Sequence, residues 1–266
     1  MQDRNKSDFV SPSEEYWSDV WQNLPMPRKV EPHDRSIRNA VRLSHIRLLN
    51  KFIVPISNRQ TKILELGCAR SIWLPYFSKQ KEFSVSGIDF SPLGCAQSRG
   101  LLENEGLTGQ IYQADFFSPP SELIGKFDYV ISFGLIEHFK DTSEALTAAA
   151  KFLCPGGTLL TLVPNMKFLP GWLQKTAQRS VFDLHVPLDH NDLDTAAKKA
   201  GLSVVANGYL MFSNFGAIFF KTNILSRMIS TILVGFSALT WFLARLGIIL
   251  PPNKYTSPYV YNVARK

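Results

Sequence analysis

The chain has 266 residues, of which 45% are hydrophobic, and a formal net charge of +7. This length accommodates one large α/β domain with an appendage, and the basic residues are too dispersed to indicate a nucleic-acid-binding tract. The three cysteines, Cys68, Cys95 and Cys154, form no CxxC or Cys/His pattern, so neither a disulfide framework nor a zinc site is predicted.

The N-terminal segment, residues 1–55, is predicted to be a helical cap. Residues 1 to about 12 are expected to be disordered, and they lack the apolar core of a signal sequence, so we expect a reducing, cytoplasmic location. Ser13 followed by two acids predicts a capped helix that ends by Pro25. A second helix is predicted from Asp34 to Ile53, where apolar residues recur on one face. The simplest role for both helices is to cover a sheet edge.

The next segment, residues 56–210, alternates short apolar strands with helices. Strands are predicted over 63–66, 83–88, 109–113, 127–132, 158–163 and 202–210, and a seventh over 259–264. This alternation predicts an α/β fold: a doubly wound, mostly parallel seven-stranded sheet with helices on both faces. In such sheets ligands bind beyond the carboxyl ends of the strands. Residues 56–210 and 258–266 are therefore assigned to one domain.

The stretch Lys62–Ser71 combines a buried strand with a tight turn of small residues. Gly67 allows the sharp turn, and the free N–H groups of the following helix would face a ligand on it. With Glu65 and Gly67, the stretch resembles the first motif of the class I S-adenosylmethionine (SAM)-dependent methyltransferases, which is an acid, one residue and then alternating glycines. Ala69 and Ser71 stand where glycines are commoner.

Two later segments carry the same resemblance. Phe127-Asp128, a buried strand and then Glu137-His138-Phe139 are similar to the fourth strand of small-molecule methyltransferases, and Leu153–Gly157 is similar to their turn into strand five. The resemblance covers roughly Thr61 to Val163 plus the final strands. It implies a Rossmann-like fold with SAM as cofactor and S-adenosylhomocysteine as product. The fuller Gly-x-Gly-x-x-Gly of a nicotinamide dehydrogenase is absent.

Acids follow three successive predicted strands. Asp89 lies about 20 residues after the glycine turn, where a ribose diol would find a carboxylate. The resemblance implies that Asp115 and Phe116 belong to an adenine pocket, and that Glu65 and the backbone near Gly67 lie by the methionine end. The remaining predicted cofactor-binding residues are Cys68, Ala69, Phe90, Phe133 and Leu135. Any one acid could instead cap a turn or helix.

Two histidines are candidates for a catalytic base. His138 follows the fourth predicted strand and His185 follows the fifth, and a histidine titrating near neutrality can accept a hydroxyl proton. His138 could instead make a structural hydrogen bond beside the cofactor. Asp183 could orient His185 or be exposed. No cluster of carboxylates and histidines is identifiable in the sequence, so no metal site is predicted.

An apolar insertion, residues 211–257, separates strands six and seven. Its uncharged run, Ile229–Ala244, is shorter than the ~20 residues that span a bilayer. One helical face is predicted to be apolar, and it consists of Ile229, Ile232, Leu233, Phe236, Leu239, Leu243 and Leu246. The simplest interpretation is a helical lid packed on the domain. The alternative is a cap that receives a lipid-linked substrate or rests on the inner membrane leaflet, with phosphates near Lys221, Arg227, Arg245 and Lys254.

The sequence therefore predicts a SAM-dependent O-methyltransferase that transfers a methyl group in line to a small-molecule, glycan or lipid-linked acceptor. Resemblance to bacterial methyltransferases of surface-polysaccharide and natural-product pathways motivates the glycan. The alternatives are N-methylation of a small molecule, a non-catalytic SAM-fold binding module and a nicotinamide oxidoreductase. No nucleic-acid partner is predicted. We expect a cytoplasmic protein with peripheral membrane contact through 211–257, and the sequence does not indicate its oligomeric state.

Overall fold

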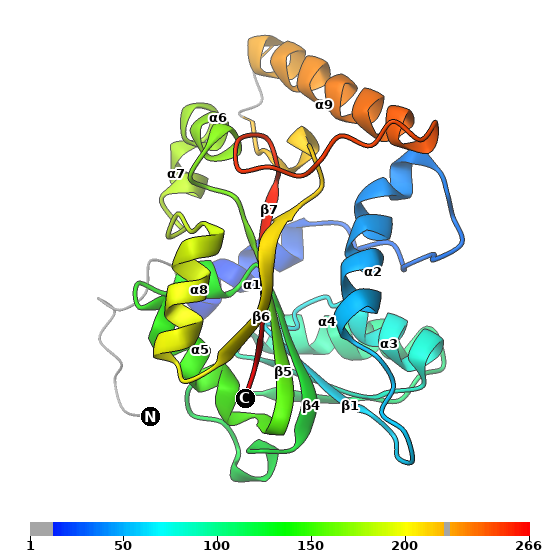
Figure 1. Cartoon of the computed structure of the whole chain (residues 1–266), viewed down its shortest axis with the longest axis vertical. Helices are drawn as coiled ribbons and strands as arrows, with labels where there is room; N and C mark the ends of the chain where they lie inside the picture. Colours follow the sequence, from blue (N-terminus) through cyan, green and yellow to red (C-terminus); the bar gives the residue numbers. More distant parts are fainter. Residues whose placement is uncertain (1–12, 221–223) are drawn as a thin grey trace.

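A computed structural model describes residues 13–220 and 224–266. The segment expected to be disordered, residues 1 to about 12, and Lys221 lie outside these ranges. A seven-stranded sheet in the order β3-β2-β1-β4-β5-β7-β6 forms the centre of the fold (Figure 1). The strands are β1 Lys62–Leu66, β2 Ser84–Asp89, β3 Gln110–Gln113, β4 Phe127–Phe133, β5 Leu153–Pro164, β6 Ser203–Leu210 and β7 Tyr259–Arg265.

The strand order reverses between β1 and β4, the two neighbours at the middle of the sheet. β1 pairs in parallel with both β2 and β4, whereas β7 runs antiparallel to both β5 and β6. In an open α/β sheet the reversal opens a crevice at the carboxyl ends of the strands, and this crevice is the usual ligand site. The predicted doubly wound, mostly parallel fold is confirmed.

Helices cover both faces of the sheet, and the central strands β1 and β4 are accordingly buried on both sides. On one face α5 and α8 pack on the strands, and on the other α2, α3 and α4 do so. The helices are α1 Glu14–Asn23, α2 Ala40–Phe52, α3 Trp73–Lys81, α4 Pro92–Glu103, α5 Thr142–Lys151, α6 Leu169–Ala177, α7 Arg179–Phe182, α8 His190–Lys199 and α9 Ile224–Arg245. Short 3₁₀ turns are η1 Ile37–Asn39, η2 Ser121–Leu123, η3 Ile136–His138 and η4 Phe215–Ala217.

Several element boundaries differ from the sequence prediction. β5 begins at Leu153 rather than at 158, because the Pro155–Gly157 turn is accommodated as an irregularity in the pairing of β4 and β5. α8 is capped by Asp189, whose carboxylate accepts the N–H groups of Asn191 and Asp192. The sequence alone predicts a helix from Asn191 to Gly201 capped by Asn191 or Asp192, so the observed cap lies two or three residues earlier. The short helices α6 and α7 were not predicted.

The insertion leaves the sheet at the edge that carries the ligand crevice. Leu210 at the end of β6 pairs with Tyr259 at the start of β7, and Tyr259 also pairs with Pro164 at the carboxyl end of β5. Between them α9 lies across the end of the molecule, apart from the sheet (Figure 1). Its length and composition would allow it to cross a membrane.

The predicted helix of the insertion is present, but its orientation differs from the lid interpretation. Only Ser237 and Thr240 are buried among the residues of α9, whereas Ile232 and Leu239 of the predicted apolar face are exposed. The most buried contacts of the helix with the domain are therefore polar, Phe236 also packs near Phe212 and Phe215, and many of the other apolar side chains face outward.

Candidate functional site

The turn after β1 has the geometry of a ligand-binding loop. Gly67 has φ +66°, a left-handed conformation that favours glycine, and a Cβ there would crowd the Leu135 side chain at 3.2 Å. The next left-handed residue is Arg70, with φ +58°. Ala69 and Ser71, which replace glycines of the motif, are not at positive φ. Their substitution therefore imposes no backbone strain.

Both substituted positions have local partners. The Ser71 hydroxyl donates to the Glu65 carboxylate and accepts the N–H groups of Trp73 and Leu74 in the first turn of α3. Ala69 packs on α4 where that helix has Gly94, since a Cβ at Gly94 would lie 2.6 Å from the Cβ of Ala69. The departure from the glycine pattern is thus compensated by neighbouring residues.

Asp89, at the end of β2, connects this turn to α4. One carboxylate oxygen accepts the Ala69 N–H at 3.0 Å and the other accepts the Ser91 N–H at 2.8 Å. Burial raises the pKa of Asp89 to about 6, although these two N–H groups act against the shift. Burial also raises the pKa of Glu65 to about 8, and the nearby Asp89 charge adds to it. Two buried acids therefore lie at the crevice where the sequence predicted cofactor contacts.

The remaining predicted cofactor residues divide into two groups. Phe90 and Asp115 are exposed at neighbouring strand ends, with Asp115 accepting the Phe117 N–H. Phe133, the last residue of β4, and Leu135 are half-buried. Cys68 and Phe116 differ from the prediction. The Cys68 thiol packs into the core against Gly87, so only its backbone can face a ligand. The Phe116 ring is buried against Phe117 and Phe139, at centroid distances of 4.3 and 5.4 Å, which leaves it unavailable for stacking on adenine.

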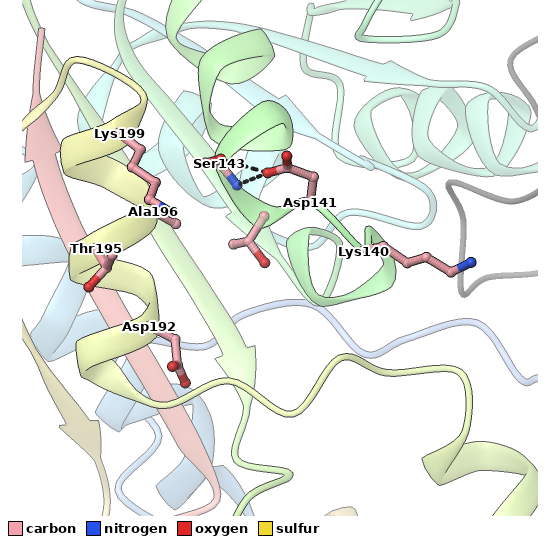
Figure 2. Close-up of a pocket in the computed structure, with 8 residues that line it drawn as sticks. Lys140, Asp141, Ser143, Asp192, Thr195, Ala196 and Lys199 are labelled. Atoms are coloured by element: carbon pink, nitrogen blue, oxygen red, sulfur yellow. Dashed lines mark hydrogen bonds between the residues drawn. The ribbon is translucent and has the colours of Figure 1, made fainter.

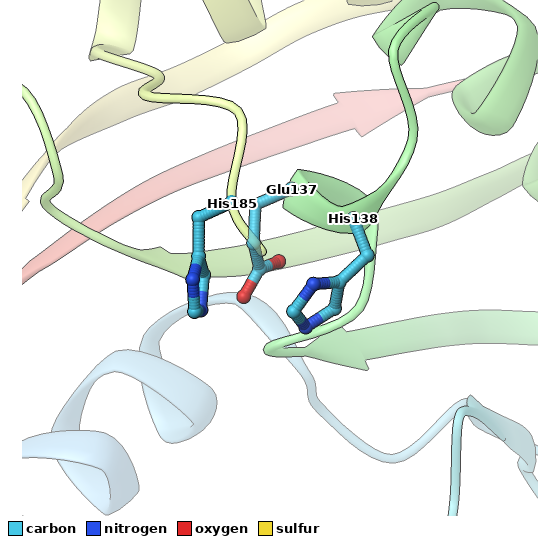
Figure 3. A group of neighbouring side chains, drawn as sticks. All are labelled: Glu137, His138 and His185. Atoms are coloured by element: carbon cyan, nitrogen blue, oxygen red, sulfur yellow. The ribbon is translucent and has the colours of Figure 1, made fainter. Parts of the chain in front are cut away.

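Glu137, His138 and His185 form a cluster next to this crevice. The carboxylate lies between the two imidazole rings (Figure 3), and one ligand atom from each residue lies within 4.8 Å of the others. The ring centroids of the two histidines are 4.8 Å apart. The sequence had singled out both histidines separately, and only the fold shows that they are neighbours.

Backbone contacts hold the two halves of the cluster together. Val186 donates its N–H to the Glu137 carbonyl at 2.7 Å, and His138 Nδ1 lies 2.7 Å from the Leu184 carbonyl. His185 Nδ1 lies 2.7 Å from the Val181 carbonyl. Because a carbonyl can only accept a hydrogen bond, Nδ1 of each ring carries the proton, and the lone pair of each neutral ring is on Nε2. The Val181 carbonyl orients His185. Of the two alternatives for Asp183 the structure shows the second, because Asp183 is exposed and pairs with Arg179.

Burial determines the charge of these three groups. It raises the pKa of Glu137 to about 8, and Glu137 Oε2 has no hydrogen-bond partner among the described residues. Burial and the neighbouring His185 lower the pKa of His138 to about 4, against the stabilising effect of the Leu184 and Gly134 carbonyls. Burial also lowers the pKa of His185, whose side chain is less enclosed than that of His138. At neutral pH both rings are therefore neutral, and each can accept a proton on Nε2.

The same donor set could hold a divalent cation, because two imidazoles and one carboxylate are common ligands of transition metals. The sequence alone does not predict this cluster, since residues 137 and 185 lie on different connections of the sheet. Adjacent Glu137 and His138 after a buried strand were the only available signal.

Helix α1 covers the crevice and contacts the cluster. The Trp17 ring lies 5.2 Å from that of His138 and stacks on Trp21 at 5.3 Å. The Arg70 guanidinium lies 5.6 Å from the Trp21 ring, and Ser18 hydrogen-bonds to Ser91 at 3.2 Å. The first helix thus touches the β1 turn, the start of α4 and the histidine cluster.

A second buried histidine was missed by sequence reasoning. His45 of α2 lies among the aromatic rings of Trp73, Phe133 and Tyr259, at centroid distances of 5.7, 6.2 and 5.1 Å. Burial lowers its pKa to about 4. Because Phe133 is the last residue of β4, this aromatic group lies at the carboxyl end of the strand, on the side of α2.

An open groove outside the crevice lies between two helices. It measures about 450 Å³ between the start of α5 and α8 (Figure 2), and none of the predicted site residues line it. Asp141 is engaged as the cap of α5 through the N–H groups of Ser143 and Glu144, and Asp192 is engaged in the cap of α8. The groove therefore presents helix caps rather than a set of convergent reactive groups.

Comparison with known proteins adds to this geometry. Residues 35–207 match a protein family described as "Methyltransferase domain". A ubiquinone biosynthesis O-methyltransferase of Cereibacter sphaeroides is 24% identical over 171 residues, which are 60% of this chain and 67% of that protein. An uncharacterised protein of Synechococcus is 28% identical over 102 residues, but these span only 37% of this chain and 24% of that longer protein.

A solved structure is similar over nearly the whole chain. It is the geranyl diphosphate C-methyltransferase of Streptomyces coelicolor in complex with Mg²⁺, geranyl diphosphate and S-adenosyl-L-homocysteine. The alignment has a TM-score of 0.63 at 13% identity and covers 96% of this chain and 98% of that one. At this identity the likeness concerns the fold.

Proposed function

Since the chain belongs to the class I SAM-dependent methyltransferase family, we propose that it methylates a hydroxyl oxygen of a small-molecule, glycan or lipid-linked acceptor. The observation that carries this proposal is the neutral His185 in the cluster with Glu137 and His138. A hydroxyl nucleophile benefits from a base that removes its proton, whereas a neutral amine does not need one. The base thus favours O-methylation over N-methylation.

The crevice residues fit SAM as a ligand. Gly67 allows the left-handed turn that ends β1 beside the crevice, and Asp89 is fixed by two N–H groups with lone pairs left for a ribose diol. The buried Glu65 would face the positively charged methionine end. SAM supplies an electrophilic methyl group on a sulfonium, whose sulfur leaves as a neutral thioether.

The chain's own residues then manage the acceptor and its proton. His185 Nε2 takes the hydroxyl proton as the oxygen forms its bond to the methyl carbon, and the Val181 carbonyl stabilises the resulting imidazolium through Nδ1–H. His138 and the Val186–Glu137 backbone bond hold this ring in place. Helix α1 excludes water above the cluster, which favours displacement by the acceptor over solvolysis.

The direct test is turnover of SAM with a panel of hydroxyl acceptors, beginning with glycans and lipid-linked sugars and followed by phenols, with amines as the comparison. We expect S-adenosylhomocysteine to form with hydroxyl acceptors and the product to carry a methyl ether. His185→Gln should reduce kcat by about 10²-fold or more while S-adenosylhomocysteine still binds.

Other results would replace the proposal. Turnover on amines alone would favour N-methylation, and cofactor binding with no turnover on any acceptor would favour the binding module. Activity that is lost with a chelator and restored by Mn²⁺ would mean that the cluster acts through a metal ion instead of as a base.

A further inference from the structure

We propose that α9 docks this protein in the plane of an anionic phospholipid bilayer. The inference concerns a surface outside the crevice and does not depend on the proposed reaction. It starts from the burial of α9, because only 11% of the most apolar 18-residue window of this helix is buried in the fold. A core helix with the same hydropathy would be covered by other elements.

The exposed apolar surface is continuous along the helix and past its end. Its most exposed members are Ile224, Leu225, Ile232, Leu246 and Ile249, with exposed fractions between 62% and 80%. A surface helix of a soluble domain turns such residues toward the core and its polar residues toward water. On α9 the most exposed residues are instead apolar, and no described element of the protein covers them.

The polar residues of α9 explain this arrangement, because they bind the domain. Ser237 Oγ accepts the Phe215 N–H at 2.9 Å, and Thr240 Oγ1 lies 2.8 Å from Ser213 Oγ. Trp241 Nε1 donates to the Ser213 carbonyl at 2.8 Å. These contacts, with Phe236 packed near Phe212 and Phe215, fix the rotation of the helix about its axis and leave Ile224, Leu225 and Ile232 facing away from the protein.

The same contacts determine how α9 meets a membrane. At ~1.5 Å per residue its 22 residues measure roughly 33 Å, which is long enough to cross a bilayer. However, the C-terminal half is hydrogen-bonded along the domain at Ser213 and Phe215, and both ends return to the paired residues Leu210 and Tyr259. The helix therefore lies in the interface with one face inserted, rather than spanning it.

The charge around the helix selects an anionic surface. No aspartate or glutamate occurs in the 72 residues from Thr195 to Lys266, which contain eight lysines and arginines. Arg227, Arg245 and Lys254 are exposed on or just after α9. The Ser36 N–H and hydroxyl lower the pKa of Asp34 in the N-terminal segment, and the Arg245 charge acts in the same direction. Trp172 and Tyr255 are also exposed, and tryptophan and tyrosine are the residues enriched at membrane–water interfaces.

This charge also distinguishes a bilayer from a second copy of the chain. A twofold contact through α9 would place the same basic residues opposite one another, and no acidic partner from residues 195–266 would compensate them. Lipid phosphates provide the compensating charge, and acyl chains provide the apolar environment.

The test is flotation of the full-length protein with vesicles of phosphatidylglycerol and phosphatidylcholine, in the absence of SAM and acceptor. We expect the wild type to float, and to bind less to phosphatidylcholine alone or at high salt. Ile232→Asp should weaken the partition by at least about tenfold, because a carboxylate in the apolar layer is costly. Val205→Asp is the matched control, since Val205 is comparably exposed but lies on β6, and it should float like the wild type.

Circular dichroism and S-adenosylhomocysteine titration on each variant verify that it is folded, so that failure of docking and failure of the proposed function are separately visible. Equal flotation of Ile232→Asp and wild type would overturn the proposal. So would a wild type that stays unbound, and in particular one that sediments as a dimer that Ile232→Asp dissociates, because α9 would then be a protein interface.

Discussion

Among individual residues, the buried acids Glu65 and Asp89 link cofactor binding to pH. In the ligand-free protein burial raises the pKa of Glu65 to about 8 and that of Asp89 to about 6. Near neutral pH Glu65 is therefore largely protonated. The predicted ligand brings an ammonium group near Glu65 and ribose hydroxyls to Asp89, and both favour the ionised carboxylates.

We therefore predict that binding of S-adenosylhomocysteine releases protons and tightens as pH rises from 6 to 8. A ligand that prefers the deprotonated acids binds more tightly at higher pH, because fewer protons must then be released on binding. Calorimetric titration at pH 7 in two buffers with different ionisation enthalpies measures the proton count directly. A count of zero, or tighter binding at pH 6, would contradict the role of these acids. Asp89→Asn should weaken binding by about tenfold or more.

His185 gives a second prediction at this scale. A general base acts in its neutral form, so kcat/KM should fall as pH drops through the pKa of His185. Burial places that pKa below the usual 6.5, so activity should persist at full value somewhat below neutrality and decline only at more acidic pH. The profile of kcat/KM against pH tests this, and His185→Gln should remove the acidic decline together with most of the rate. A decline retained in that variant would assign it to another group.

At the level of elements, the contact between the β1 turn and α4 explains how the chain dispenses with two motif glycines. The turn has Ala69 where the motif commonly has glycine, and α4 has Gly94 opposite it, which leaves room for the Ala69 methyl group. Ser71 replaces another glycine and uses its hydroxyl to join Glu65 to the first turn of α3. The glycine requirement thus belongs to the packing of strand, turn and helix together.

This packing predicts a reciprocal effect. Gly94→Ala should lower S-adenosylhomocysteine affinity and destabilise the fold by about 1–3 kcal/mol, because its Cβ would lie 2.6 Å from that of Ala69. Ala69→Gly alone should be nearly neutral, and the double variant should recover most of the lost affinity. Titration and Tm of the four proteins form a double-mutant cycle. Additive losses without recovery would show that the two residues do not compete for the same space.

For the whole molecule, cofactor binding and the proposed membrane docking belong to different segments of the chain. The crevice is built by β1, β2, β4 and the segments that follow them, and α1 covers it. Residues 211–257 contribute none of the crevice residues described above. The insertion arises from the same edge of the sheet as the crevice (Figure 1). A bilayer against the outward face of α9 would therefore lie near the end of the fold that holds the crevice, as a lipid-linked acceptor requires.

A variant in which a short Gly-rich turn replaces residues 212–256 tests this separation. Met211 and Ser257 are already neighbours, because the Ser257 hydroxyl donates to the Met211 carbonyl at 2.5 Å. We expect a cooperatively folded protein with a somewhat lower Tm, because buried Phe215 is lost, and with unchanged S-adenosylhomocysteine affinity. Vesicle binding should disappear. Loss of cofactor affinity in a folded variant would show that the insertion supports the crevice.

The sequence by itself determined the elements that depend on local pattern. Alternating strands and helices, Gly67 in its turn and Asp89 at a strand end follow from periodicity and backbone preference, which act between residues close in the chain. It also predicted the apolar helix of the insertion. Its family assignment and doubly wound fold were confirmed, although the cofactor contacts of individual residues stay predictions.

Only the tertiary structure decided which side chains meet and which way they face. Glu137, His138 and His185 converge because the connection after β5 returns to the end of β4. The resemblance placed Cys68 and Phe116 at the cofactor. In the fold the Cys68 thiol packs against Gly87 and the Phe116 ring packs against Phe139, so both side chains lie in the core. The orientation of α9 was decided by hydrogen bonds from Ser237 and Thr240 to a segment more than 20 residues earlier in the chain, a contact that helical periodicity alone cannot reveal.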